Sequence, residues 1–174
     1  MSYLIISSSL NSNSKSKILA NELQKDLQQQ DVPNLKFLDL KDYALPICDG
    51  DQSYDDSNVK FLTEEINKAQ LIILASPIYN YYACASAKNL IELTGKAWEN
   101  KIVAFLCAAG GRNSYMSIMN IASSLMLDFR CVIVPRFIYA IPDDFEDSQL
   151  INHNLKSRIK KLSEEVIFFH DRLA

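Results

Sequence analysis

Hydroxyl and amide side chains are concentrated in one short stretch of the chain, Ser7 to Ser16. This stretch directly follows an apolar run, Tyr3 to Ile6, and precedes a segment whose leucines recur at helical spacing. Free backbone N–H groups and the helix dipole favour an anion at such a helix start, so the stretch predicts a phosphate-binding loop. Serine and asparagine are also ordinary capping residues, which leaves open a capped helix without a ligand. The stretch lacks glycine, which excludes a Walker-type loop and the dinucleotide-binding glycine fingerprint.

Aromatic side chains gather in a second stretch, Pro77 to Ala85, at the end of another apolar run. It holds Asn80 and the tyrosines Tyr79, Tyr81 and Tyr82. Phenol rings and an amide make a flat rim with hydrogen-bonding groups, which suits a planar aromatic ligand. The alternative is a set of tyrosines that pack on the surface, for example at a dimer contact.

A third stretch, Ala108 to Ser114, contains Gly110 and Gly111, two of the four glycines in the chain. Glycine lets the backbone approach a ligand closely, although a tight turn between a strand and a helix needs it equally. The three stretches therefore offer anion-binding, aromatic and close-contact surfaces.

Five apolar runs are continuous rather than alternating, which is typical of strands buried on both faces. They cover residues 3–6, 35–40, 70–76, 102–107 and 131–134. Helical spacing of apolar residues occupies 14–30, 57–69, 86–94 and 114–127, and a last stripe runs from Leu150 to Phe169. This alternation predicts one α/β domain over residues 1–174, a doubly wound five-stranded parallel sheet with helices on both faces. Ligands bind beyond the carboxyl ends of such strands, where the three stretches lie.

The composition predicts a soluble protein of the cytoplasm. Of the 174 residues 48% are hydrophobic, and the formal net charge of -3 argues against nucleic acid as a partner, since that role needs a basic face. No run approaches the roughly 20 apolar residues of a membrane span and no signal segment is expected, so no membrane partner is predicted. The cysteines form no Cys-x-x-Cys pair and are expected to be buried structural thiols rather than disulfides or metal ligands: Cys48, Cys84, Cys107 and Cys131.

Together the three stretches resemble the NADPH-dependent FMN reductase family, the flavodoxin-like group that includes quinone, azo-dye and chromate reductases. The strongest element is Pro77-Ile78-Tyr79-Asn80 followed by Lys88-Asn89-Leu90-Ile91-Glu92, which looks like the family's Pro-x-Tyr-Asn loop and the helix after it. The stretch Leu45-Pro46-Ile47-Cys48-Asp49 agrees with it. The resemblance covers nearly the whole chain and implies a flavodoxin-like fold that binds FMN.

The resemblance also implies which residues contact the FMN phosphate. Hydroxyl groups would hold it from Ser9, Ser14 and Ser16. Asn11 stands where the family commonly has arginine, which removes a charge-assisted bidentate contact. Affinity for the phosphate must then depend on hydroxyls, backbone N–H groups and a contribution from Lys15 or Lys17.

The flavin ring would be bordered by the other two stretches. The second stretch would supply Pro77, Ile78, Tyr79 and Asn80, and the third would pass along the polar edge of the ring with Ala109, Gly110 and Gly111. Arg112 could meet the 2′-phosphate of NADPH, but a single arginine in a glycine-rich loop is more often a solvated charge.

The function implied is that of an NAD(P)H-dependent oxidoreductase, with NADPH or NADH as co-substrate. Hydride would pass through FMN to a small electron acceptor such as a flavin, a quinone, an azo compound or a metal oxyanion. No catalytic side chain and no metal ligand is predicted, and His153 and His170 are expected on the surface of the last helix. The alternatives are a non-catalytic FMN-binding electron carrier and an interaction module that has lost its cofactor.

The family is typically dimeric or tetrameric, so a homodimer or homotetramer is expected. Aromatic residues outside the apolar runs are candidates for interface anchors or for the core: Tyr81, Tyr82, Trp98 and Phe129.

Overall fold

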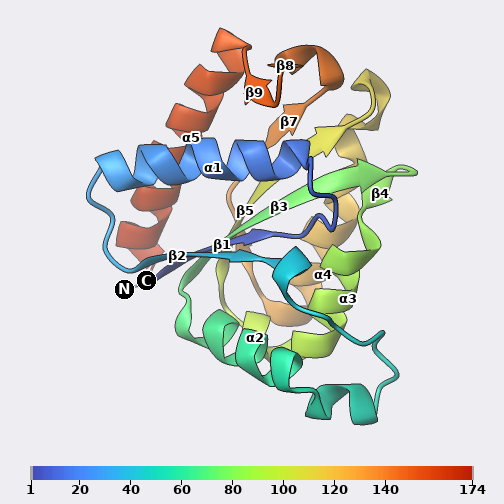
Figure 1. Ribbon diagram of the computed structural model, residues 1–174. Coiled ribbons are helices and arrows are strands. Elements are labelled where there is room, and N and C mark those ends of the chain that lie inside the picture. Colours follow the sequence, from blue (N-terminus) through green and yellow to red (C-terminus); the bar gives the residue numbers. More distant parts are fainter. Residues whose placement is uncertain (1, 174) are drawn as a thin grey trace.

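The computed structural model describes residues 2–173, and in them a seven-stranded sheet runs through the molecule (Figure 1). Its strands are β1 (Tyr3–Ser7), β2 (Leu35–Asp39), β3 (Leu71–Tyr79), β4 (Tyr82–Ala83), β5 (Ile102–Ala109), β6 (Val132–Ile133) and β7 (Ile138–Ala140). The main order is β2-β1-β3-β5-β6, with β4 beside β3 and β7 beside β5. All pairs in this sheet are parallel except β3 with β4. Strand order reverses between β1 and β3, because the chain passes from β1 outward to β2 and then back across β1 to β3.

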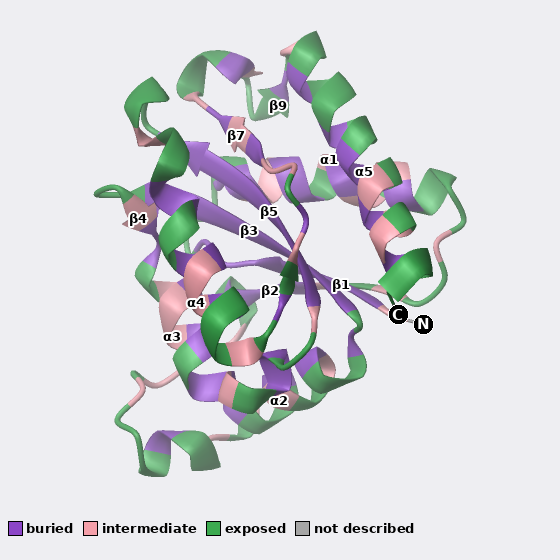
Figure 2. Ribbon diagram, turned by 180° about the vertical axis from the view of Figure 1, so that it is seen from behind, coloured by how far each residue is buried: buried purple, intermediate pink, exposed green. Residues whose placement is uncertain are grey.

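Helices cover both faces of this sheet, as Figures 1 and 2 show. One face carries α1 (Lys15–Gln29) and α5 (His153–Leu173), whose apolar stripes join one core cluster with residues of β1, β3 and β5. The other face carries α2 (Ser57–Lys68), α3 (Ala85–Thr94) and α4 (Met119–Phe129), which form the second cluster. Every residue of β1 and of β5 is buried, because side chains of both alternating sets meet a helix layer. The predicted flavodoxin-like, doubly wound sheet is confirmed.

The predicted count of five strands is wrong, because the strand beside β5 is divided into β6 and β7 and the short strand β4 is added beside β3. The backbone N–H of Val134 still donates to Val103 at 2.9 Å, but Pro135 has no N–H to donate, and pairing with β5 resumes only at Ile138 in β7. A separate hairpin of β8 (Phe145–Glu146) and β9 (Gln149–Leu150) follows. Leu150 therefore belongs to this hairpin and not to the last helix, which begins at His153.

Two side chains differ in burial from what the sequence pattern predicts. Met126 belongs to the apolar spacing of the helix predicted over 114–127, which places it inward, but it is 40% exposed. His170 is expected on the surface but is 1% exposed: its ring centroid lies 4.6 Å from that of Tyr3, and its Nε2 lies 3.3 Å from Oε1 of Gln70. The imidazole lies one helical turn after Val166 on the buried stripe of α5, where it packs against the tilted phenol ring of Tyr3. Burial, followed by the charge of Asp171, raises the pKa of Tyr3 to about 12.

The structure also shows which of the other aromatic candidates belong to the core. Trp98 is fully buried and its Nε1 donates to the hydroxyl of Thr94 at 2.8 Å, so it is a core residue and not an interface anchor. Phe129 packs against the same core cluster. His153 is exposed as expected. Among residues 2–173, every helix is too short or too polar to cross a bilayer.

Candidate functional site

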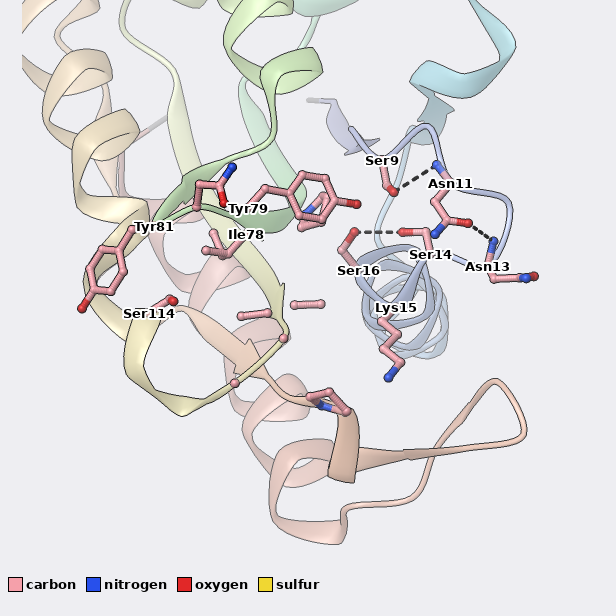
Figure 3. A pocket seen from close by; sticks show the side chains of 17 residues that line it. Ser9, Asn11, Asn13, Ser14, Lys15, Ser16, Ile78, Tyr79, Tyr81 and Ser114 are labelled. Carbon is pink, nitrogen blue, oxygen red and sulfur yellow. Dashed lines mark hydrogen bonds between the residues drawn. The ribbon is translucent and has the colours of Figure 1, made fainter.

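The serine-rich loop between β1 and α1 is held by its own side chains (Figure 3). The backbone N–H of Asn11 donates to Ser9 Oγ at 3.3 Å, and Asn11 Oδ1 accepts from the N–H of Asn13 at 2.9 Å. Ser14 Oγ lies 3.0 Å from Ser16 Oγ. Ser9, Ser14 and Ser16 are all buried, although the loop lies at the edge of the sheet. The loop is therefore a shaped structure rather than a loose connection.

The N-terminus of α1 combines a cap with free donors. Ser14 is the N-cap, and its hydroxyl accepts from the N–H of Lys17 at 3.1 Å. No hydrogen-bond acceptor in residues 2–173 meets the backbone N–H of Lys15 or Ser16, the first two positions of the helix. The capped-helix interpretation is therefore correct for Ser14, and it leaves two amide donors for an anion.

The two lysines of the loop have different surroundings. Lys17 Nζ lies 2.6 Å from Asp39 Oδ2, so its charge is paired with the end of β2. Lys15 makes no ion pair among the described residues, and its Nζ lies 5.5 Å from the centre of the Phe145 ring. Lys15 is thus the lysine that can meet an anion at this helix start.

The second loop makes a two-residue hairpin turn between β3 and β4. Tyr79 pairs with Tyr82, and the turn residues Asn80 and Tyr81 have φ angles of 50° and 67°. Positive φ at both positions matches a type I′ turn, which asparagine enters easily and tyrosine does not. Tyr81 OH donates to the carbonyl of Asn113 at 2.5 Å, which ties this turn to the third loop. Tyr79 and Tyr81 remain 54% and 57% exposed.

The third loop contains two glycines that the fold itself does not require. A Cβ atom added to Gly110 or Gly111 would meet no atom of the described chain within 4 Å. Neither residue has the positive φ that favours glycine, since Gly111 is extended at φ −172° and Gly110 lies outside the left-handed range. The tight-turn explanation for these glycines therefore fails, and close approach of a ligand remains.

These three loops line one cavity of about 810 Å³ at the carboxyl ends of β1, β3 and β5 (Figure 3). The structure brings all eleven residues selected from the sequence to its wall: Ser9, Asn11, Ser14, Ser16, Pro77, Ile78, Tyr79, Asn80, Ala109, Gly110 and Gly111. The loops named in the sequence also contribute Asn13, Lys15, Tyr81, Ala108 and Ser114. Pro142 lines the cavity as well; it follows β7, which lies in a short apolar run, 137–141, outside the five predicted strands.

Beneath the cavity, Cys84 joins the first two loops. Its Sγ lies 3.2 Å from Ser8 Oγ and 3.4 Å from Ser76 Oγ, and its backbone N–H donates to Ser76 Oγ at 3.2 Å. Ser8 in turn donates its hydroxyl to the carbonyl of Ala75 at 2.9 Å. This buried network fixes the end of β1 against the end of β3, and so sets the distance between the loops above.

The cysteines are free, and Cys84, Cys107 and Cys131 are buried, as expected; Cys48 is partly exposed. Burial raises the pKa of Cys107, with a smaller contribution from Cys84, and burial raises the pKa of Cys131 to about 11. Such thiols are poor nucleophiles because the thiolate is disfavoured. Residues 2–173 contain no group of His, Cys, Asp and Glu side chains suited to a metal ion.

The cavity wall suits a ligand that is anionic at one end and planar at the other. In the described part of the chain no aspartate, glutamate or histidine lines it, while Lys15 does. Hydroxyls and free N–H groups lie at the α1 end, and Ile78, Tyr79 and the glycine backbone lie at the other. The wall therefore offers binding and orientation rather than a nucleophile or a general base.

Comparisons with known proteins agree with this description. The family model described as NADPH-dependent FMN reductase matches residues 1–146. An NAD(P)H-dependent FAD/FMN reductase of Geobacillus thermodenitrificans is 30% identical over 141 residues, 79% of this chain and 76% of that protein. An oxidoreductase structure from Corynebacterium diphtheriae superposes with a TM-score of 0.81 at 15% identity, covering 100% of this chain and 99% of the other. An archaeal flavodoxin superposes with a TM-score of 0.68 at 14% identity, over 98% and 99% of the two chains.

Proposed function

The chain belongs to the NADPH-dependent FMN reductase family, and we propose that its cavity binds FMN and serves an NAD(P)H-dependent oxidoreductase. The observation that carries the proposal is the convergence of three loops, distant in sequence, on one cavity at the carboxyl ends of the central strands. This cavity lies beside the reversal of strand order between β1 and β3, where doubly wound sheets bind their ligands.

The serine-rich loop is the proposed seat of the FMN phosphate. Ser9, Ser14 and Ser16 would offer hydroxyl donors, and the free N–H groups of Lys15 and Ser16 would add backbone donors at the positive end of α1. Asn11 lies on the cavity wall but its Oδ1 is occupied by the N–H of Asn13. It would therefore shape the loop more than it contacts the phosphate.

The flavin ring would lie between the second and third loops. Pro77, Ile78, Tyr79 and Asn80 border this part of the cavity on one side, and Ala109, Gly110 and Gly111 on the other. The space beside the two glycines is what a flat ring needs for close contact with backbone, and the fold gives no other reason for it.

The chemistry would be hydride transfer, which bound FMN supplies by accepting from NADPH or NADH and giving to a small acceptor. The residues of the chain would hold the ring, keep one face open and orient it through backbone and amide donors. A small-molecule acceptor such as a quinone, a flavin, an azo compound or a metal oxyanion is supported by the family and by the open, uncharged ring side of the cavity.

Visible absorbance of the purified protein tests this proposal. We expect a flavin spectrum, or its appearance on titration with FMN, and bleaching when NADPH or NADH is added without oxygen. Bound FMN that no nicotinamide nucleotide bleaches would favour the electron-carrier alternative. A protein that takes up no FMN would reject the proposal.

We also propose a homodimer or homotetramer in the cytoplasm. Exposed apolar side chains on the outer side of α4 and the turn before it support an interface: Met116, Met119, Met126 and Leu127. Four free cysteines support a reducing compartment. Sedimentation should give a multiple of the chain mass, and the change Leu127→Glu should shift it toward the monomer; a monomeric wild-type protein would reject the interface.

A further inference from the structure

A second cavity, of about 380 Å³, adjoins the candidate FMN cavity. The two share a thin wall at two places in the chain: Gly111 lines the first and Arg112 the second, and Pro142 lines the first while Ile141 lines the second. Consecutive Cα atoms are about 3.8 Å apart, so at these two places little more than the backbone separates the two cavities. The hydroxyl of Tyr139, which also lines the second cavity, donates to the carbonyl of Gly111 at 2.5 Å and fixes this wall.

Two guanidinium groups line the second cavity. Arg112 and Arg158 are both exposed, and neither forms an ion pair with a described carboxylate. Arg158 donates to the carbonyl of Phe137 at 3.2 Å, which orients its side chain. Arginine presents several N–H donors in a planar fork that matches phosphate, so two unpaired arginines in one cavity favour a phosphate group.

The one acidic side chain in this cavity forms no ion pair with either arginine. Asp144 is buried, and its Oδ2 accepts from the N–H of Ile141 at 2.8 Å. Its Oδ1 accepts from Nδ2 of Asn152 at 2.6 Å. Both carboxylate oxygens are thus engaged with the backbone and the amide that hold the β8–β9 hairpin to the start of α5.

An aromatic surface completes the cavity. The ring of Tyr115 is 43% exposed, and its centroid lies 4.7 Å from that of Phe137 and 5.4 Å from that of Tyr139. These neighbours hold the Tyr115 ring in place while it stays accessible, and a purine base stacks readily on such a ring. The cavity therefore combines a platform for a base with cations for a phosphate.

We propose that this second cavity binds the 2′-phosphorylated adenosine half of NADPH, while the nicotinamide half reaches the FMN cavity across the Gly111 and Pro142 wall. This inference rests on the proposed function, and it deepens it by assigning Arg112 and Arg158 as the residues that select NADPH over NADH. NADH lacks the 2′-phosphate and would leave both guanidinium groups in water. Discrimination of about tenfold or more is expected from charge-assisted hydrogen bonds to that group.

Binding of adenosine 2′,5′-bisphosphate, measured by calorimetry against adenosine 5′-monophosphate, tests the site without any turnover. The wild-type protein should bind the bisphosphate about tenfold more tightly, and Arg112→Gln and Arg158→Gln should each remove most of that difference. Arg172→Gln, a change at the far end of α5, is the matched control and should retain it. Equal affinities in the wild type, or a difference that survives in both cavity variants, would overturn the inference.

Kinetics provide a second readout. The ratio of kcat/KM for NADPH to kcat/KM for NADH should fall about tenfold in Arg112→Gln, mainly through KM, and should stay constant in Arg172→Gln. A ratio that Arg112→Gln leaves constant would count against the site. The titration needs no FMN, so a protein that binds the bisphosphate but not FMN would reject the proposed function alone. A protein whose FMN is bleached but which ignores the 2′-phosphate would reject this inference alone.

Discussion

The two ends of the candidate FMN cavity are built in opposite ways. The serine end, formed by Ser9, Ser14 and Ser16, is buried and bonded within itself and to the start of α1. The ring end, formed by Tyr79, Tyr81, Gly110 and Gly111, is exposed, and the glycines have open space where side chains would lie. The serine end is thus already formed before any ligand binds, whereas the ring end leaves open space for a ligand.

This difference predicts that the serine end determines the affinity for FMN and that the ring end determines access of substrates to the flavin. A preformed anion site needs little ordering when it binds, so most of the FMN affinity should come from the serine end. An open ring end allows a nicotinamide and then an acceptor to approach the same face. Changes at the serine end should therefore reduce FMN binding, while changes at the ring end should alter contact with the ring at little cost to folding.

The largest effect is expected from a charge at the serine end. Ser14→Asp keeps an N-cap that α1 accepts well, so the free energy of unfolding should not fall. The new carboxylate would face the phosphate, and two charges about 4 Å apart repel by about 4 kcal/mol near a protein surface, so the Kd for FMN should rise about a thousandfold. Fluorescence titration with FMN measures it.

The matched control exchanges the same residue types at another helix. Asp56 is the N-cap of α2, where it accepts from the N–H groups of Asn58 and Val59 at 2.8 Å and 3.1 Å. Asp56→Ser should leave the Kd for FMN unchanged. Wild-type affinity in Ser14→Asp would show that the phosphate does not lie at the start of α1.

The next effect concerns the open space at the ring end. Gly111 is extended and a Cβ there meets nothing, so Gly111→Val should keep the free energy of unfolding within about 0.5 kcal/mol of the wild type. The valine would occupy the space meant for the ring, and the Kd for FMN should rise about tenfold. Thermal unfolding and FMN titration of one preparation measure both.

Gly95 provides the opposite pattern. It follows α3 with a φ of 32°, so Gly95→Val should lower the free energy of unfolding by about 1 kcal/mol or more, and FMN affinity should not change. If both valine variants lose stability and neither loses FMN, the glycines serve the fold and the ring lies elsewhere.

A smaller effect is expected where the loop departs from the family. Asn11→Arg would add a charge-assisted contact to the phosphate, worth about 1.5–3 kcal/mol, but it would remove the bond to the N–H of Asn13, worth about 1 kcal/mol. FMN binding should tighten severalfold at low salt. Asn11→Ala, which loses the loop bond and gains nothing, should weaken it; arginine and alanine variants with equal affinity would contradict the placement of the phosphate.

The smallest effect belongs to the contact between the second and third loops. Tyr81→Phe removes the hydroxyl that donates to Asn113 at the surface, so stability should change by less than about 0.5 kcal/mol and the Kd for FMN by less than about twofold. Amide hydrogen exchange near Asn113 should rise, while exchange in α1 should not. A large loss of FMN in this variant would show that the ring end is as rigid as the serine end.

The parts of the fold that a local pattern encodes could be predicted from the sequence. Continuous apolar runs located β1, β3 and β5, and polar or glycine-rich residues at their ends located the three loops that meet in the cavity. Parallel strands bring their carboxyl ends to one edge, so residues far apart in sequence could be placed together without tertiary information.

The parts of the fold that depend on tertiary contacts could not be predicted from the sequence. β8 and β9 contain two residues each, too few for an alternating or continuous pattern. β7 lies in a short apolar run, 137–141, which only its pairing with β5 identifies as a strand. Pro142 and the second cavity follow from that segment and were missed with it. The burial of His170 likewise depends on Tyr3, which lies at the other end of the chain.

The buried indole described above has a practical consequence for all of these measurements. Trp98 is the one tryptophan of the chain, and it lies in the core cluster on the face covered by α2, α3 and α4, outside the cavity wall. Its emission therefore comes from a single dry environment and should shift to the red when the protein unfolds. Oxidised flavin absorbs in the range where indole emits, so cofactor uptake should quench the same signal without that shift. Intensity and wavelength of one fluorophore would then distinguish a variant that cannot bind from a variant that cannot fold.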